Sequence, residues 1–444
     1  MNKRTIRKWL TPGLSVKRWL LLLGFGITIL SVAVAQVLVE VYRNEGLPSL
    51  LQVITLRFLP PIWRVLIALI LGIGALVIAI RELNRSIIAP FSRRTRGELV
   101  DIIYNNARLQ QGIKLVALGG GTGLPAVLRG MRTQTSQITA IVTMADDGGS
   151  SGKLRREFGV LPPGDVRNNI AALADDEALM TQLFQYRFAE GGLEGHSFGN
   201  LLLTALAAIT GSMETAIVEA ANVLAIEGRV LPSTVNDVVL AAEVRLGNGN
   251  LVHVVGESSI TEAGGKIERV SLQPSSARAY PEAIRAILTA DVIVIGPGSL
   301  FTSILPNLLI EGIPEAIRAS TALKLYVCNI ATQKGETDSF NVADHILALE
   351  KHVGRGLFNV VLANNAFPTA NAGLNTIYVP TVTPNHEVRD RYDIIETDLT
   401  DEQRPWRHSA DKLTKAILGV WAARKAADPV SARLTTGNHS LKVS

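Results

Sequence analysis

Glycine, acidic and short polar residues follow several apolar runs in this sequence, and together these residue types can hold a phosphorylated ligand. The first such group comes directly after the apolar run 113–118 and consists of Gly119, Gly120, Gly121, Thr122 and Gly123. With Ala126, its last two glycines match the Gly/Ala form of the dinucleotide fingerprint. Glycines let the backbone approach a phosphate closely, and the helix expected next presents free N–H groups. We therefore expect a nucleotide phosphate here; a purely structural tight turn is the alternative.

A second group follows the apolar run 138–145 and consists of Asp146, Asp147, Gly148, Ser150 and Ser151. An acidic residue at the end of the second strand of such a domain usually binds a ribose hydroxyl. We assign this group to nucleotide binding. Mg²⁺ would be held by Asp146 and Asp147 only if the protein transfers a phosphoryl-linked group; otherwise the sequence predicts no metal site.

A third group precedes a predicted helix from Ile170 and consists of Asp165, Arg167 and Asn168. Asp165 is expected to cap this helix, because an Asp side chain accepts the free N–H groups of a first turn. Arg167 either has no role beyond that turn or clamps a phosphate.

A fourth group opens the apolar helix predicted over 201–209 and consists of His196, Ser197 and Asn200. Polar groups at a buried helix start are costly when they lack partners, so we expect them to contact a ligand. A core histidine bonded to the backbone is the alternative for His196.

A second glycine turn follows the apolar run 290–295 and contains Gly296, Gly298 and Ser299. It repeats the order strand, glycine turn and helix, so we expect a second phosphate cradle. The lone cysteine, Cys328, lies in a later strand and is expected to be a small buried hydrophobe. Polar clusters thus follow at least four strands, and in open parallel sheets ligands bind at that edge.

These elements predict an α/β fold, with a Rossmann-like, mostly parallel sheet and helices on both faces, over residues 113–427. A β-rich insert is expected at about 236–273, where Asn248-Gly249 between two alternating runs indicates a hairpin. The polar tail 428–444 is expected to be disordered.

The first hundred residues differ from the rest in charge and hydropathy. They hold 14 of the 44 Lys and Arg residues but only four of the 39 acids. Apolar runs predict two transmembrane helices, at about 19–39 and 62–80, within a membrane anchor over 1–96, followed by a connector over 97–112. Lys and Arg flank the outer ends of both runs, so the main domain is expected in the cytoplasm and the protein in the cell membrane. The basic charge favours lipid, and not nucleic acid, as the partner of this segment. The alternatives are a cleaved signal peptide for the first run and a helix lying on the membrane surface for the second.

Taken together and in this order, the polar groups resemble those of the CofD/YvcK family, over about residues 113–400. Gly148-Gly149-Ser150-Ser151-Gly152 and Pro163-Gly164-Asp165 look like the YvcK versions, those of the gluconeogenesis factors. The resemblance implies a Rossmann-like core that binds a nucleotide sugar such as UDP-GlcNAc and supports cell shape and envelope synthesis on gluconeogenic carbon. It leaves room for a homo-oligomer and for a protein partner in envelope synthesis. The two predicted spans depart from typical soluble members.

Two functions remain open on this basis. The first is a regulatory nucleotide-sugar binder of the YvcK type. The second is an enzyme like 2-phospho-L-lactate transferase, which moves a phospholactyl group from a nucleotide diphosphate with a divalent metal. An NAD-dependent oxidoreductase has support only from the first glycine turn. No residue is assigned a catalytic role.

Overall fold

The computed structural model describes residues 107–174, 179–369 and 376–427, with a few isolated residues nearer the amino terminus. The chain divides into two units, Met1–Arg108 and Leu109–Ser444. The two segments expected to span the membrane, 19–39 and 62–80, lie almost entirely outside the described residues, and so do most of the connector and the tail from 428. Among the residues that are described, no helix combines the length and apolar character needed to cross a bilayer.

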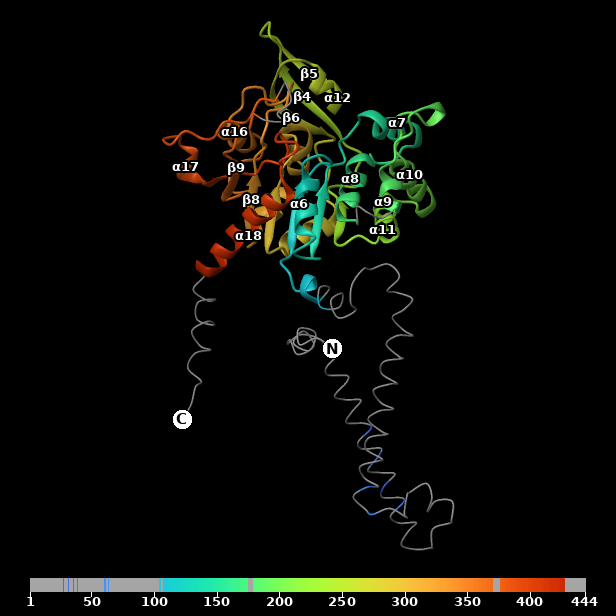
Figure 1. The fold of residues 1–444 in the computed structure, drawn as a ribbon. Helices are drawn as coiled ribbons and strands as arrows, with labels where there is room; N and C mark the ends of the chain where they lie inside the picture. Colours follow the sequence, from blue (N-terminus) through green and yellow to red (C-terminus); the bar gives the residue numbers. More distant parts are fainter. Residues whose placement is uncertain are drawn as a thin grey trace, which may run out of the picture. The chain divides into compact units, whose positions relative to one another are not determined.

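A seven-stranded sheet forms the centre of the second unit (Figure 1). Its order is β10-β9-β8-β7-β1-β2-β3, and every neighbouring pair is parallel. The five middle strands, from β9 to β2 in this order, are buried except at Lys324, which explains their nearly continuous apolar sequences. The strands are β1 (Leu115–Gly119), β2 (Ile138–Val142), β3 (Arg229–Pro232), β7 (Val292–Ile295), β8 (Leu323–Val327), β9 (Val360–Asn364) and β10 (Asp393–Thr397).

Helices cover both faces of this sheet. A right-handed crossover from β1 to β2 places α6 on one face, and the crossovers from β7 to β8 and β9 run the other way and place their helices on the opposite face. Packing agrees, because α6 contacts α8 and α18, whereas α15 contacts α13 and α14. The helices are α6 (Leu124–Met131), α7 (Gly149–Phe158), α8 (Gly164–Leu173), α9 (Leu179–Gln185), α10 (Phe198–Thr210), α11 (Met213–Leu224), α13 (Pro281–Leu288), α14 (Leu305–Leu308), α15 (Ile313–Ala319), α16 (Val342–Val353), α17 (Val388–Arg391) and α18 (Ala410–Ala427).

A separate three-stranded antiparallel sheet lies within 239–273, inside the range expected for the β-rich insert. Its order is β5 (Leu251–Val255), β4 (Val239–Arg245) and β6 (Lys266–Gln273). Gly249, at φ +85°, forms the turn between β4 and β5. A short helix that the sequence did not lead us to expect, α12 (Glu257–Glu262), connects β5 to β6.

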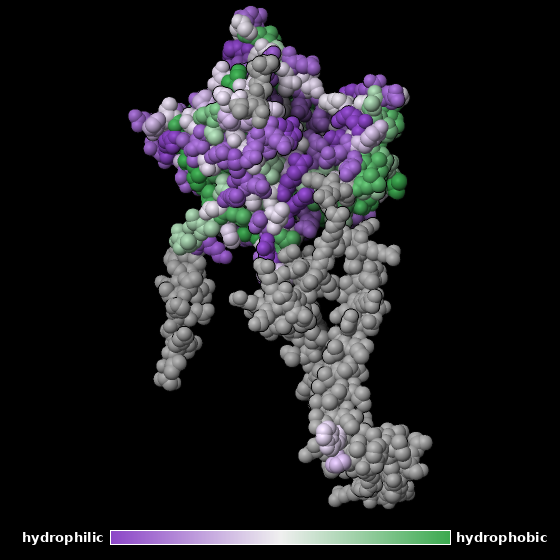
Figure 2. Space-filling view, viewed as in Figure 1, coloured by the Kyte–Doolittle hydropathy of each residue, from purple (hydrophilic) through white to green (hydrophobic). Residues whose placement is uncertain are grey.

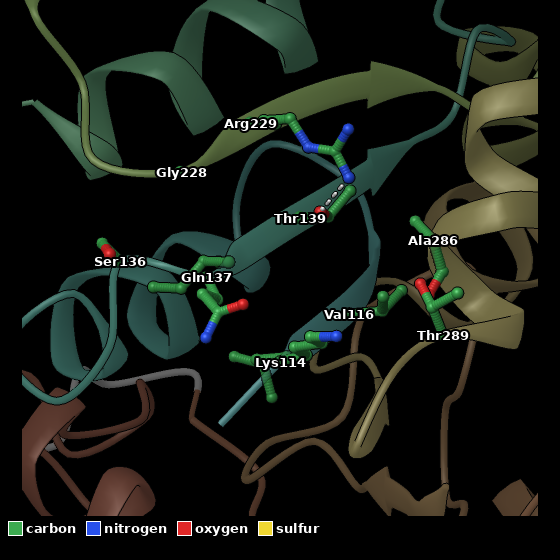
Figure 3. A pocket seen from close by; sticks show the side chains of 11 residues that line it. Lys114, Val116, Ser136, Gln137, Thr139, Gly228, Arg229, Ala286 and Thr289 are labelled. Carbon is green, nitrogen blue, oxygen red and sulfur yellow. Dashed lines mark hydrogen bonds between the residues drawn. The ribbon is translucent and has the colours of Figure 1, made fainter. Parts of the chain in front are cut away.

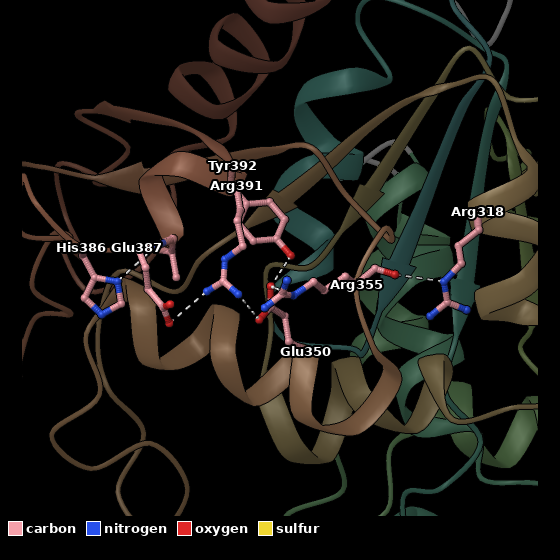
Figure 4. A network of polar contacts seen from close by, with 8 residues as sticks. Arg318, Glu350, Arg355, His386, Glu387, Arg391 and Tyr392 are labelled. Atoms are coloured by element: carbon pink, nitrogen blue, oxygen red, sulfur yellow. Dashed lines mark hydrogen bonds and ion pairs between the residues drawn. The ribbon is translucent and has the colours of Figure 1, made fainter.

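Ion pairs and apolar surface mark two regions away from the polar edge of the sheet. The Glu350 carboxylate of α16 accepts from Arg391 Nη1 at 3.0 Å and from Tyr392 Oη at 2.7 Å, which joins α16 to the end of α17 (Figure 4).

On the right of Figure 2, apolar side chains gather over α9 to α11, where Leu179 and Ile209 are each about four-fifths exposed.

Candidate functional site

The two glycine turns meet at the switch point of the sheet, where strand order departs in opposite directions from β1 and β7. They are in backbone contact there. A Cβ on Gly123 would lie 2.4 Å from the carbonyl oxygen of Pro297, and one on Gly120 would lie 2.5 Å from Ser303 Oγ. Glycine at these two positions is therefore required by packing against the neighbouring turn, before any ligand is considered.

Two buried asparagines fix the glycine turn after β1, residues 119–123, which we call the β1 turn. The sequence did not indicate this role for either asparagine. Asn169 of α8 donates from Nδ2 to the carbonyl of Gly120 at 3.1 Å, and Asn307 of α14 donates to that of Gly119 at 2.9 Å. Both side chains are fully buried. Both bind carbonyl oxygens, so neither asparagine uses an N–H group of the turn.

Asp165 does not cap its helix as expected. The helix begins earlier, at Gly164, with Pro163 as the N-cap residue, and no side chain caps it. The Asp165 carboxylate instead contacts the β1 turn. It accepts the N–H of Gly121, and a Cβ on that glycine would lie 2.5 Å from Asp165 Oδ1. Burial, with the nearby charge of Asp146, raises the pKa of Asp165 to about 7.

The two acidic residues that follow β2, Asp146 and Asp147, make different contacts. Asp146 accepts the Gly148 N–H at 2.9 Å, and burial raises its pKa. Asp147 faces the insert, where Oδ1 accepts from both the N–H and the hydroxyl of Ser258 at 3.0 Å. Asp147 Oδ1 therefore satisfies the first turn of α12, as a capping carboxylate does.

Glu257, in the first turn of α12, brings another carboxyl to this edge. Burial and then the charges of Asp146 and Asp165 raise its pKa to about 9, and its Oε2 is buried without a partner among the described residues. No local pattern indicates this residue, because it belongs to the insert, more than 100 residues after Asp146 in the chain.

Opposite these acids lies a buried network of the predicted polar residues. Ser150 Oγ lies 3.0 Å from His196 Nδ1 and accepts from Asn200 Nδ2 at 3.0 Å. Arg167 donates to Asn168 Oδ1 at 2.7 Å and to the hydroxyl of Ser197, which caps α10. Arg167 Nε and Asn200 Oδ1 are buried and have no partner within the described part of the chain. Buried polar atoms of this kind indicate a missing polar ligand or water.

The second glycine turn is filled by the protein itself. Glu336, which was not selected from the sequence, accepts at Oε1 from the hydroxyls of Ser299 at 2.7 Å and Thr302 at 3.2 Å. The N–H of Gly298 is used by Asn329 Oδ1 at 3.1 Å. Gly296, at φ +79°, is needed for the conformation of this turn.

The structure therefore places most of the predicted residues at one edge but gives them different surroundings. The residues gathered around the β1 turn and the first turns of α7, α8 and α10 are Gly119, Gly120, Gly121, Thr122, Gly123, Asp146, Gly148, Ser150, Ser151, Asp165, Arg167, Asn168, His196, Ser197 and Asn200. Asp147 and the group of Gly296, Gly298 and Ser299 are engaged by the protein. Over the described residues, no three acidic, His or Cys side chains are disposed to hold a metal ion.

A groove of about 370 Å³ lies at the other edge of the sheet, at the amino-terminal ends of β1, β2 and β3 (Figure 3). Lys114 and Arg229 line it together with Thr139, whose hydroxyl accepts from Arg229 at 3.2 Å. None of the predicted site residues lines this groove.

Comparison with known proteins finds similarity over most of the second unit. The family described as "2-phospho-L-lactate transferase CofD" matches residues 115–400. A "Putative gluconeogenesis factor" of Nostoc sp. is 48% identical over 376 residues, which cover 82% of this chain and 80% of that protein. The "Gluconeogenesis factor" of Bacillus subtilis is 50% identical over 253 residues, which cover 57% of this chain and 78% of that protein. A crystal structure of a UPF0052 family member from Bacillus halodurans is 45% identical, with a TM-score of 0.65, and covers 69% of this chain and 99% of that one.

Proposed function

Because this chain belongs to the CofD family and is similar to its gluconeogenesis factors, we propose that it is a YvcK-type factor that binds a nucleotide sugar. UDP-GlcNAc or a related sugar would be the ligand, and the bound protein would support cell morphogenesis and envelope synthesis during gluconeogenic growth. The observation that carries the proposal is the pair of buried atoms, Arg167 Nε and Asn200 Oδ1, left without partners in one network. A cation that can bind a phosphate beside an amide that can bind a sugar or base suits a nucleotide sugar.

The test is a titration of the full-length protein with UDP-GlcNAc, UDP-glucose and ADP. Calorimetry measures the binding, and thermal unfolding measures the change in stability. We expect one of the UDP-sugars to bind saturably and to raise the unfolding midpoint, since a ligand of the native state stabilises it by mass action. Failure of all nucleotide sugars to bind would falsify the proposal.

The transferase alternative rests on a different observation, the three carboxyls of Asp146, Asp165 and Glu257, whose charges reach one another. A divalent metal would have to arrive with the diphosphate, because no three acidic, His or Cys side chains among the described residues are disposed to hold one. Incubation with a nucleotide diphosphate donor and Mg²⁺, with product detected by mass spectrometry, separates the two functions. Metal-independent binding without turnover supports the regulatory binder, and strict Mg²⁺ dependence with turnover supports the transferase.

We also propose that residues 1–96 anchor the protein in the cell membrane with the main domain in the cytoplasm. The proposal is supported by the uncharged run 19–39 and by the excess of Lys and Arg outside the two apolar runs. A reporter fused after Ser444 should be active only in the cytoplasm, and one inserted near Glu45 only outside. The opposite pattern would contradict the proposal.

A further inference from the structure

The Gly296–Ser299 turn already holds an anion, which is the carboxylate of Glu336. Besides the hydroxyls of Ser299 and Thr302, this carboxylate accepts the N–H groups of Phe301 and Thr302, at the start of the π-helical turn η2 (Leu300–Ile304). It is 8% exposed. These are the contacts that a phosphate makes at a helix start, so Glu336 occupies the position expected for one.

The two glycine turns also leave no gap for a diphosphate to bridge them. The carbonyl oxygen of Pro297 would be 2.4 Å from a Cβ on Gly123, so the two backbones are separated by little more than a van der Waals contact. A ligand that spans both turns would have to part them.

The first turn of α7 is the anion position that the protein leaves open. Its N-cap residue is Gly148, which has no side chain to satisfy the N–H groups that follow. Within the described residues, no hydrogen bond uses the N–H of Gly149, Ser150 or Ser151. The space beside Gly149 is open, since a Cβ there would meet nothing within 4 Å.

Two side chains show that this turn faces a ligand. Arg167, which is 9% exposed, has its Nε without a partner and lies in the electrostatic reach of Asp146, the residue before the turn. Asn200, which is 2% exposed, donates to Ser150 Oγ inside the turn and has its Oδ1 without a partner. One buried cation and one buried amide are thus incompletely bonded beside an uncapped helix start.

Asp146 opposes an anion here, because its carboxylate accepts the Gly148 N–H next to the turn. Burial raises its pKa and so weakens that opposition, while the partial positive charge of the α7 start and the full charge of Arg167 favour the anion.

We propose that the phosphate of the ligand binds at the first turn of α7, against Arg167, and not in the Gly296–Ser299 turn. Asn200 Oδ1, an acceptor, is then left to bind a donor group of the same ligand. This deepens the proposed function, on which the identity of the whole ligand rests, by locating its charged group. It also predicts that a phosphate-bearing anion without sugar or base binds at the same place.

The experiment is calorimetric titration of the full-length protein with inorganic pyrophosphate and, separately, with UDP-GlcNAc. Arg167→Lys and Asn200→Asp should weaken both ligands by about tenfold or more, because the first loses the planar guanidinium and the second adds a negative charge beside the turn. Gly298→Ala should bind both within about twofold of the wild type, since its new methyl finds no protein atom closer than 3.6 Å and no ligand phosphate. Asn222→Asp, the same change on the exposed part of α11, is the matched control.

The outcomes separate this inference from the proposed function. Loss of binding in Gly298→Ala, with wild-type affinity in Arg167→Lys and Asn200→Asp, would place the phosphate in the second turn and overturn the inference alone. Pyrophosphate binding with the expected pattern, but no binding of UDP-GlcNAc, would support the inference and count against the nucleotide sugar. No binding of either ligand by the wild type would overturn both. Thermal unfolding of each variant shows whether a loss of binding results from a loss of the folded structure.

Discussion

Asn169 and Asn307 reach the β1 turn from helices on opposite faces of the sheet and bind its successive carbonyls, those of Gly120 and Gly119. Each side chain also donates to the carbonyl four residues before it, that of Asp165 in α8 or of Ser303 in η2. The turn is therefore fixed from both faces by the same arrangement. This relationship explains how a glycine-rich segment can be held in one conformation at the switch point of the sheet.

We expect Asn169→Ala and Asn307→Ala each to lower the free energy of unfolding by about 1–3 kcal/mol, because each leaves a buried carbonyl of the turn without its donor. Urea unfolding of the variants measures this loss. Asn222→Ala, on the exposed part of α11, should change stability by less than about 0.5 kcal/mol. Equal losses of stability at all three positions would contradict the role of Asn169 and Asn307 in holding the β1 turn.

The sequence predicted those elements whose residues are neighbours in the chain. The run 113–118, the glycines and Pro125 lie close together in the chain, and they form β1, the turn and α6 as expected. Asn248-Gly249 likewise lies at the predicted hairpin, because a two-strand turn is set by its own residues.

The parts of the site that the sequence did not predict depend on contacts between residues that are far apart in the chain. Glu336 binds Ser299, which lies 37 residues before it in the chain, and no local pattern could show this contact. Asp147, for which we predict a ribose or metal contact, also accepts from Ser258 in the first turn of α12, a helix that the sequence did not indicate. Asp165 was predicted to cap its helix, but its carboxylate accepts the N–H of Gly121, which lies 44 residues before it in the chain.

Glycine substitutions should distinguish packing from ligand binding. In Gly121→Ala the new Cβ would lie 2.8 Å from Asp165 Cα, a backbone atom that cannot move freely, so we expect a loss of about 1–3 kcal/mol in the free energy of unfolding. Gly298→Ala has its nearest protein atom at 3.6 Å and should lose less than about 1 kcal/mol. Urea unfolding of both variants checks the difference, and similar losses would contradict it.

The pKa of Glu257 predicts how stability depends on pH. Burial and the neighbouring acids raise this pKa to about 9, above its ordinary 4.5, so between these values the folded state holds a proton that the unfolded chain has released. The free energy of unfolding must then fall as pH rises through that window. Glu257→Gln removes this titration, and we expect the variant to gain at least about 1 kcal/mol relative to the wild type between pH 5 and pH 9. Parallel stability curves for the two proteins, measured by urea unfolding at each pH, would contradict the assignment.

Glu336 offers the last prediction, because its carboxylate is an internal substitute for an external anion. In Glu336→Ala the hydroxyls of Ser299 and Thr302 and two backbone N–H groups lose their acceptor, and we expect a loss of about 2–4 kcal/mol in the free energy of unfolding. The substitution also empties a position at a helix start that favours small anions. Formate, acetate or inorganic phosphate should therefore raise the unfolding midpoint of the variant, with about 1.4 kcal/mol regained at ten times the dissociation constant. The wild type, with the position filled, should show only the general effect of salt, and so should Glu282→Ala, whose lost partner, Arg285, is exposed. If anions stabilise all three proteins equally, the turn is not an anion site, and the reason for excluding the ligand phosphate from it is lost.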